Sequence, residues 1–298
     1  MLSIHMNNLS SSLEYEVFNH ILQNGVDTPD RTGVGCRKVL GVSVEWSSNT
    51  FPISTVRPLG LRFAWEEMKL FLSGNDNTKV LEDQGIKFWV GNTSREFLDR
   101  QGLTMIPEGS LGAAYSKQFR KADHWSGGYI DQFKNLYEGL RDNPYSRRHA
   151  IDLWAVHDHD LMPILPCWWR SNWSVTPTKK GNKVLHLQLY SRSNDFLLGY
   201  WQAAMQYRML QTVLANLLGY EVGIMITNLW DVHVYHNQFE YVDELLSRKD
   251  GTPPSHFYLT RSVDKFEDIL DVDYTDFELS NYNPNTRPFN TPKPPMAV

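Results

Sequence analysis

The sequence predicts a single domain of the α+β class, with a mixed or largely antiparallel central sheet flanked by helices. Helical and strand-like segments follow one another without the regular strand–helix–strand alternation of a parallel α/β fold. No linker rich in Pro, Gly or Ser divides the 298 residues, and no internal repeat is visible. Hydrophobic residues make up 41% of the chain, enough for one sizeable core. We expect residues 1–10 to be a frayed terminus and residues 11–298 to form the domain.

Turn formers and glycines delimit the elements of the first half. The segment 12–26 has apolar residues at helical spacing and ends near a glycine, which predicts a helix followed by a stop. A loop over 27–35 then leads into 36–46, which alternates like a strand. Residues 59–72 are typical of a buried helix closed by Ser-Gly, and residues 129–141 of an amphipathic helix.

The second half contains most of the predicted sheet. Residues 149–157 are strand-like, and 169–177 and 183–191 are alternating strands joined by KKGN, a turn typical of a hairpin. Helical periodicity returns over 202–218 and again over 231–248, with a strand at 221–227 between them. The tail, about 282–298, contains too many prolines for a helix or a central strand, so it must lie over the surface or over a site.

Composition and charge exclude several classes of protein. The net charge of -5 lacks the basic field expected of a general nucleic-acid coat protein, so we expect no nucleic-acid polymer as a partner. Two cysteines are too few for a disulfide framework. The first residues lack a basic stretch followed by an apolar one, and no apolar run is long enough to span a bilayer, so we expect a cytoplasmic protein that contacts no membrane. HDHD at 157–160 could suggest a metal, but it follows a predicted strand as a polar turn would, so we expect no metal site.

Cys167 is the candidate nucleophile, although a cysteine in this context is by default a small buried hydrophobe. Arginines on flanking segments favour the other interpretation, because cations stabilise a thiolate and bind phosphate through paired hydrogen bonds. These arginines are Arg31, Arg147, Arg148 and Arg192. For any single one of them a solvated surface role is the simpler interpretation, but four in turns or at strand ends are harder to dismiss.

Several ordered segments resemble a known family. They are DRTGVG at 30–35, PYSRRHAIDLW at 144–154, LPCW at 165–168, LYSRSNDFLLG at 189–199 and DVHVYHNQF at 231–239. In order and approximate spacing they are similar to signature segments of thymidylate synthases and related pyrimidine hydroxymethylases. The likeness also covers GSLGAAYSKQFR, the FLSGNDNT helix end and a tail, KPPMAV, similar to the family's closing segment. The resemblance implies that family's fold and a homodimer formed through the sheet.

The resemblance also implies a chemistry. Cys167 would add to C6 of a pyrimidine deoxynucleoside monophosphate, which makes C5 able to attack 5,10-methylenetetrahydrofolate. No metal takes part in this family's reaction. Glu67 and Tyr115 match groups that organise proton transfer, and Asp195 matches the aspartate that holds the pterin ring. Without the resemblance, Glu67 would be taken for an exposed helix carboxylate and Tyr115 for a packed aromatic.

The remaining site residues are likewise implied by the resemblance. Arg31, Arg192 and Ser193 match a phosphate clamp that Arg147 and Arg148 complete from the partner subunit. His233 and Tyr235, two apart, would face the same way in an extended segment and bind the sugar hydroxyl. The sugar and base site would also include Asn194, Gln202, Ala203 and Trp168, and the folate site Trp89, Asp195, Gly199 and Val298.

Two positions depart from the synthase pattern. Trp168 stands where ordinary synthases have histidine, and Ala203 stands where an asparagine reads uracil. Gln202, Gln206, Asn228 or water must then satisfy the base, so uracil and cytosine both remain open. Asn194 and Trp168 are more similar to hydroxymethylases, whereas the proline-rich tail is synthase-like. We expect a 5-hydroxymethyl product, which would suit a phage that modifies its DNA, with reductive methylation to thymidylate as the alternative.

Two interpretations from other classes stay open. Cys167 could serve a cysteine hydrolase with His149 or His233 as its base, although no sequence feature marks an oxyanion hole. The fold could also be retained as a non-catalytic nucleotide- or RNA-binding protein. That second interpretation is less economical, because the cysteine, the glutamate, the tyrosine and the arginines are all present.

Overall fold

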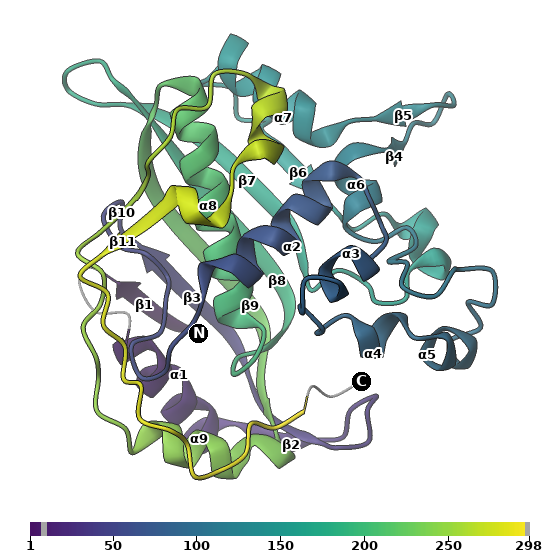
Figure 1. Ribbon diagram of the computed structural model, residues 1–298, viewed down its shortest axis with the longest axis vertical. Helices are drawn as coiled ribbons and strands as arrows, with labels where there is room; N and C mark the ends of the chain where they lie inside the picture. The colour runs from purple at the N-terminus through teal and green to yellow at the C-terminus, as the bar shows by residue number, and fades with distance from the viewer. Residues whose placement is uncertain (7–10, 296–298) are drawn as a thin grey trace.

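A mixed sheet forms the centre of the computed structural model, which describes residues 1–6 and 11–295 (Figure 1). Two neighbouring pairs in this sheet, β1 with β3 and β8 with β9, are parallel, and the other pairs are antiparallel. The α+β prediction is therefore confirmed. Along the sheet the order is β1 (Leu2–Met6), β3 (Cys36–Trp46), β9 (Glu221–Tyr235), β8 (Lys183–Asp195), β7 (Trp168–Pro177) and β6 (Ala150–Asp152), and β2 (Val26–Thr28) also pairs with β3.

Three long helices cover one face of this sheet. They are α1 (Ser11–Asn24), α2 (Leu61–Ser73) and α8 (Tyr200–Leu218). Figure 1 shows α2 and α8 crossing in front of the strands, and α8 packs against both β8 and β9. Most residues of helix α8 are buried, including the polar Gln206, Arg208 and Gln211, because the helix is enclosed by the core on nearly all sides. It ends at Gly219, whose φ of 65° gives the left-handed turn that closes a helix.

Shorter elements surround this core. Between α2 and β6 the chain forms a group of short helices and a small hairpin, which projects from the body in Figure 1. After β9 the chain returns through a helix and a second hairpin to the tail. These elements are α3 (Lys79–Glu82), α4 (Val90–Thr93), α5 (Arg95–Arg100), α6 (Ser116–Arg120), β4 (Ala122–Asp123), β5 (Tyr129–Ile130), α7 (Gln132–Asp142), η1 (Val156–Leu161), η2 (His236–Gln238), α9 (Phe239–Leu246), β10 (His256–Leu259), η3 (Phe266–Asp271), η4 (Tyr274–Asp276) and β11 (Phe277–Ser280).

The second face of the sheet is largely uncovered. Side chains on it alternate with buried ones along β9 and β8, the pattern of a sheet with one face in the core. Several apolar residues lie there, among them Trp169, Tyr190 and Trp230, and Trp230 is 58% exposed. A shallow apolar hollow runs across this face. Among residues 1–6 and 11–295, no helix is long and apolar enough to cross a membrane.

Three predicted elements are corrected by the structure. Residues 2–6 are not frayed but form β1, whose Ile4 and Met6 are buried; residues 7–10 lie outside the described part. The helix expected over 231–248 is wrong at its start, because β9 continues to Tyr235 and α9 begins only at Phe239. The strand expected over 149–157 is limited to β6, and residues 156–161 form the 3-10 helix η1. In the first two cases long-range strand pairing overrides the local pattern.

Candidate active site

One large cavity lies beside α8, α2 and the ends of β8 and β9. Its volume is about 1570 Å³, above the range typical of a site for one small molecule, so it can hold two ligands side by side. Its lining brings together most of the residues that the sequence singled out. They are Arg31, Glu67, Trp89, Tyr115, Cys167, Trp168, Arg192, Ser193, Asn194, Asp195, Gly199, Gln202, Ala203, His233 and Tyr235.

Cys167 directly precedes β7, beside Arg192 on the neighbouring strand. The backbone N–H of Arg192 donates to the Cys167 carbonyl oxygen over 2.9 Å. The Arg192 guanidinium donates to the carbonyl oxygens of Leu165 and Pro166, over 2.7 and 3.1 Å, and so fixes the turn that carries the thiol. Burial raises the pKa of the Cys167 thiol, whereas Arg192 and Arg31 act in the opposite direction. A further cation near the thiol would make the thiolate form more readily, and an apolar ligand beside it would make the thiolate form less readily.

Tyr115 connects the thiol to the aromatic wall of the cavity. Its hydroxyl accepts a hydrogen bond from the Cys167 backbone N–H over 3.1 Å, and its ring stacks on Phe71. The φ of Tyr115 is 42°, in the region that residues with a side chain rarely adopt. Such strain persists only where surrounding contacts enforce it, and it is concentrated at functional sites. Burial raises the pKa of the Tyr115 hydroxyl, which therefore stays protonated at neutral pH.

Glu67 is a buried carboxylate rather than an exposed one. Its Oε1 accepts a hydrogen bond from the indole N–H of Trp89 over 2.6 Å, and its Oε2 accepts from the side-chain amides of Gln206 and Gln202. Burial raises the pKa of Glu67 to about 7, and the three donors oppose the shift. A carboxyl group with this pKa can both take up and release a proton near neutral pH, as general acid–base catalysis requires.

His233 is held in place by a second carboxylate. Its Nδ1 lies 2.9 Å from Asp231 Oδ1, and Asp231 Oδ2 accepts from Lys38 Nζ over 2.6 Å. Since β9 continues to Tyr235, the side chains of His233 and Tyr235 point to the same side and their rings touch edge to face. The expectation that the two side chains face the same way from an extended segment therefore agrees with β9, and their binding of a sugar hydroxyl stays a prediction. Sequence reasoning missed Lys38 and Asp231, whose roles depend on pairing between β3 and β9.

Asp195 closes the end of β8 with a fixed carboxylate. Its two oxygens accept hydrogen bonds from the Leu198 backbone N–H over 3.0 Å and from Gln238 Nε2 over 2.9 Å. Its own carbonyl oxygen accepts from the Gly199 N–H over 2.8 Å. Burial raises the pKa of Asp195. This carboxylate retains acceptor capacity toward the cavity, as a group that holds a ring N–H must.

Some predicted residues lie elsewhere. Asn228 does not line the cavity: its side chain bonds Ser43 and the Leu189 carbonyl and belongs to the opposite face, so it cannot read a base there. Arg147 and Arg148 are exposed on the turn before β6, away from the cavity. Val298 lies outside the described residues.

Of the two histidines considered as the base of a cysteine hydrolase, only His233 lines the cavity. His149 does not line the cavity, and its Nε2 lies 2.9 Å from the Asn143 carbonyl oxygen, so it is no base for Cys167. His233 does line the cavity, with Nδ1 engaged by Asp231.

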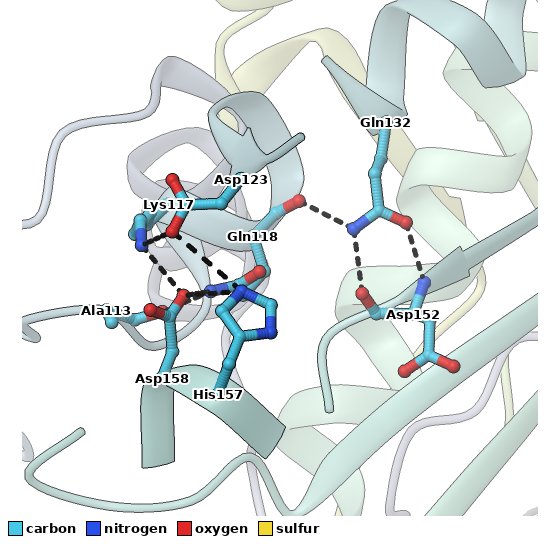
Figure 2. A network of polar contacts seen from close by, with 8 residues as sticks. All are labelled: Ala113, Lys117, Gln118, Asp123, Gln132, Asp152, His157 and Asp158. Carbon is cyan, nitrogen blue, oxygen red and sulfur yellow. Dashed lines mark hydrogen bonds and ion pairs between the residues drawn. The ribbon is translucent and has the colours of Figure 1, made fainter. Parts of the chain in front are cut away.

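The acidic and imidazole groups near HDHD already hold a cation of the protein's own. Figure 2 shows Lys117 Nζ between Asp123 and Asp158, 2.8 and 2.7 Å from their Oδ2 atoms, with His157 alongside. Gln118 also donates to Asp158, over 2.6 Å. A metal ion at this point would have to displace the ammonium group, since both positive charges need the same oxygens. The network instead ties α6, which follows Tyr115, to η1.

The cavity also has two cations that sequence reasoning missed. Arg57 donates to the buried carboxylate of Glu14 and to the Leu197 carbonyl. Of the two placements expected for the tail, over the surface or over a site, Lys293 and Pro294 take the second, because both line the cavity. Burial lowers the pKa of Lys293, and Arg57 adds to that effect. Arg57 stands in none of the segments quoted above, whereas Lys293 opens KPPMAV, which marked the tail but not the role of this lysine.

The tail is fastened to the body just before it reaches the cavity. The Glu244 carboxylate on α9 accepts hydrogen bonds from the backbone N–H groups of Asn290 and Thr291, over 2.8 and 2.7 Å. Arg248 donates to the carbonyl oxygens of Asn285 and Arg287 and lies over the Phe289 ring. These contacts hold the tail down by its backbone, so side-chain changes along it are tolerated more easily than loss of Glu244 or Arg248.

Comparison with known proteins agrees with this arrangement. The sequence model of the thymidylate synthase family matches residues 14–293. The chain is 33% identical over 288 residues to the human protein described as thymidylate synthase, covering 94% of this chain and 88% of that one. It is 32% identical over 287 residues to thymidylate synthase of Saccharomyces cerevisiae, covering 91% of this chain and 93% of that one.

Proposed function

This chain belongs to the thymidylate synthase family, and on that premise we propose that Cys167 is the nucleophile of its folate-dependent one-carbon transfer to C5 of a deoxypyrimidine monophosphate. The single observation that carries the proposal is the position of Cys167, whose turn Arg192 fixes, in one cavity with Glu67, Tyr115 and Asp195. The family uses methylenetetrahydrofolate as co-substrate and needs no metal.

Nucleophilic addition activates the base. The Cys167 sulfur forms a bond to C6, and the electrons of the C5–C6 double bond move toward C5 and the carbonyl or amino end of the ring. Arg31, Arg192 and Ser193 bind the phosphate, and His233 with Tyr235 binds the sugar hydroxyl. Asp231 and Lys38 support this role, because they fix the orientation of the His233 ring.

Proton transfer at C5 falls to the group around Glu67. Glu67, with a pKa of about 7, and the hydroxyl of Tyr115 are both within the cavity and can hold a water between them and the ring. Loss of the C5 proton breaks the bond between the one-carbon unit and the folate nitrogen and leaves an exocyclic methylene on C5. After water or hydride adds to that methylene, the electrons return to form the C5–C6 double bond and the Cys167 sulfur leaves.

The co-substrate fits the second half of the cavity. Methylenetetrahydrofolate supplies a one-carbon unit at the oxidation level of formaldehyde. Asp195 would accept from a ring N–H of the pterin, and Trp89 and Gly199 would line its faces. The volume of about 1570 Å³ supports simultaneous binding of nucleotide and folate.

We favour a 5-hydroxymethyl nucleotide as product. Gln202 and Gln206 both donate to Glu67, and with Asn194 they give the cavity wall three carboxamides that can hold water. Water that adds to the activated one-carbon unit gives the hydroxymethyl group with tetrahydrofolate. Such a product would suit a phage that modifies its DNA.

Reductive methylation of dUMP is the second candidate, because Lys293 and Pro294 bring the tail to the cavity mouth. A closed mouth excludes water, so hydride from the folate can complete the reaction and dihydrofolate is released. The human and yeast relatives are described as thymidylate synthases, which also favours this candidate.

A homodimer through the uncovered sheet face is the assembly we propose. The apolar hollow there, lined by Trp154, Trp169 and Trp230 among others, supports burial against a second copy. Arg147 and Arg148, exposed and outside their own cavity, would complete the partner's phosphate site. By two-fold symmetry, the phosphate site of each chain would receive the two arginines of the other chain.

Mass spectrometry tests the core of this proposal. The protein is incubated with methylenetetrahydrofolate and either 5-fluoro-dUMP or 5-fluoro-dCMP. The fluorine replaces the C5 proton and cannot leave as the proton does, so the reaction stops at the covalent adduct. A covalent ternary adduct mapped to Cys167 is expected with at least one nucleotide, and absence of an adduct with both overturns the proposal. Products from dUMP, dCMP and CMP then identify the base and the added group, and dihydrofolate absorbance that rises in step with nucleotide consumption overturns hydroxymethylation.

A further inference from the structure

Three residues of α8 form the wall of the cavity beside Glu67. Gln202 and Gln206 are four residues apart and Ala203 and Gln206 are three apart, so all three lie on one side of the helix and line the cavity. The methyl group of Ala203 takes little space between its two longer neighbours. The carboxamide of Gln206 therefore has room to reach the cavity, although its side chain is only 3% exposed.

The direction of the Gln206 carboxamide is set by Glu67. An ionised carboxylate only accepts hydrogen bonds, so the amide nitrogen of Gln206, not its oxygen, faces Glu67 Oε2. The other oxygen of Glu67 is occupied by Trp89, whose indole N–H can only donate. Gln206 Oε1 then has no hydrogen-bond partner among residues 1–6 and 11–295, and it is left as an acceptor at the cavity wall.

A second buried carboxamide on the same cavity needs a partner. Asn194, at the end of β8, is 2% exposed, and its Oδ1 has no hydrogen-bond partner in the described part of the chain. Buried polar atoms in native proteins are almost always paired, so an orphan oxygen on a cavity wall indicates a ligand or water at that point. The wall thus presents acceptors from two directions.

We propose that Gln206 is the residue that selects the pyrimidine base, with Oε1 accepting a hydrogen bond from the donor on the base edge. That donor is N3–H in uracil or the 4-amino group in cytosine, and because the two lie at different points of the ring edge, an acceptor fixed in one place serves only one base. The inference rests on the proposed function, because it assumes a pyrimidine nucleotide in this cavity. Glu67 contributes by fixing which atom of the Gln206 carboxamide faces the base. Gln202 contributes no hydrogen bond to the base, since its contact with Glu67 is longer, at 3.4 Å, and its side chain is less buried.

The test compares Gln206→Met with Gln202→Met at pH 8, where Glu67 is ionised. Both substitutions keep the length of the side chain, remove a carboxamide from α8 and remove one donor from Glu67, so they are matched controls. We measure kcat/KM for dUMP and dCMP with methylenetetrahydrofolate. Gln206→Met should lower kcat/KM for the preferred nucleotide about tenfold or more and leave the other nearly unchanged, because the donor on the preferred base loses its acceptor.

The ratio of kcat/KM between the two nucleotides separates base selection from a structural role. In Gln202→Met the ratio should stay within about twofold of the wild-type value. Equal losses for both nucleotides in Gln206→Met would mean a structural role and would overturn the inference. So would a ratio that changes in Gln202→Met and not in Gln206→Met.

Failure of the inference is distinguishable from failure of the proposed function. A wild-type protein that turns over neither nucleotide and forms no Cys167 adduct refutes the proposed function, and the inference with it. A wild-type protein that is active, with a ratio unaltered in Gln206→Met, refutes the inference alone. Titration of the Cys167 adduct in each variant gives the concentration of folded sites, so a variant that folds poorly does not distort the ratio.

Discussion

The Tyr115 hydroxyl accepts a hydrogen bond from the Cys167 backbone N–H, so the phenol and the thiol are fixed relative to each other before any ligand binds. We expect Tyr115→Phe to lower kcat about 10²- to 10⁴-fold, the usual contribution of a positioned proton-transfer group. Nucleotide affinity should stay within about threefold, since the phosphate and sugar contacts remain. Stopped-flow turnover and nucleotide titration separate the two effects, and a loss confined to affinity would contradict the assignment.

Cys167→Ser should abolish turnover and leave nucleotide binding intact, because a hydroxyl is a far weaker nucleophile than a thiolate.

The charges around the thiol predict how fast it is alkylated. Burial raises the pKa of Cys167 and Arg192 opposes the shift, so Arg192→Ala should raise that pKa further. Alkylation by iodoacetamide at pH 8 should then slow about three- to tenfold. Arg170→Ala, on β7 and paired with Asp152, is the control and should leave the rate unchanged.

Arg192→Ala should also weaken nucleotide binding by about 1.5 to 3 kcal/mol, the range for a hydrogen bond to a charged group. Calorimetric titration with the nucleotide monophosphate measures it, and the corresponding nucleoside is the control, because it lacks the phosphate. An equal loss with the nucleoside would show that Arg192 acts only on the shape of the turn at Leu165 and Pro166.

Glu67→Gln should abolish activity and change how stability depends on pH. The folded-state pKa of about 7 lies above the ordinary value of 4.5, so the contribution of Glu67 to stability is fully present below 4.5 and lost as pH rises through 7. Glutamine does not titrate, so the variant should gain about 2 to 3 kcal/mol relative to wild type between pH 5 and pH 8. Urea unfolding at both pH values measures the gap, and Glu66→Gln on the same helix is the control. A gap that does not change with pH would contradict the prediction.

Lys117→Met should destabilise the fold by about 2 kcal/mol, because it leaves the buried Asp158 carboxylate without its cation. Asp123→Asn, on the exposed side of the same lysine, should cost less than about 1 kcal/mol.

The same cluster of side chains should bind no metal ion. Thermal unfolding with and without EDTA or added Mn²⁺ should give the same Tm for wild type. A Tm that rises with Mn²⁺ in the wild-type protein would show that a metal can displace Lys117.

Subunit exchange tests the proposed dimer. Cys167→Ser lacks the nucleophile and a double variant, Arg147→Ala with Arg148→Ala, lacks the arginines. If these arginines complete the partner's site, a mixed dimer regains one intact site, and mixing the two inactive proteins under exchange conditions should restore about a quarter of the wild-type activity. Additive, near-zero activity in a preparation that light scattering shows to be dimeric would mean that the arginines act within their own chain.

Local patterns were sufficient for much of the fold. The hairpin of β7 and β8, the helices α2 and α8 and the mixed character of the sheet follow from alternation, turn residues and apolar periodicity. The ordered motifs also predicted residues that converge on one cavity, among them Cys167, Arg192 and Asp195, whose roles stay proposals.

Long-range contacts account for what the sequence did not reveal. DVHVY at 231–235 has helical spacing with its successors, yet it is strand because β3 and β8 pair with it on either side. The orientation of His233 depends on Lys38, nearly two hundred positions earlier. Burial of Glu67 likewise arises from Trp89 and from α8, and no local pattern records these partners.

The pairing of β3 with β9 also sets the order of events while the chain is made. Cys36 pairs with Tyr235 and Trp46 with Met225, so β3 leaves the ribosome long before its central partner exists. At about 5 to 20 residues per second, that wait is roughly ten to forty seconds. β1 can cover one edge of β3 at once, because it lies in the same short stretch of chain. The other edge stays unpaired for that interval, a time when aggregation competes with folding and a chaperone has most to contribute.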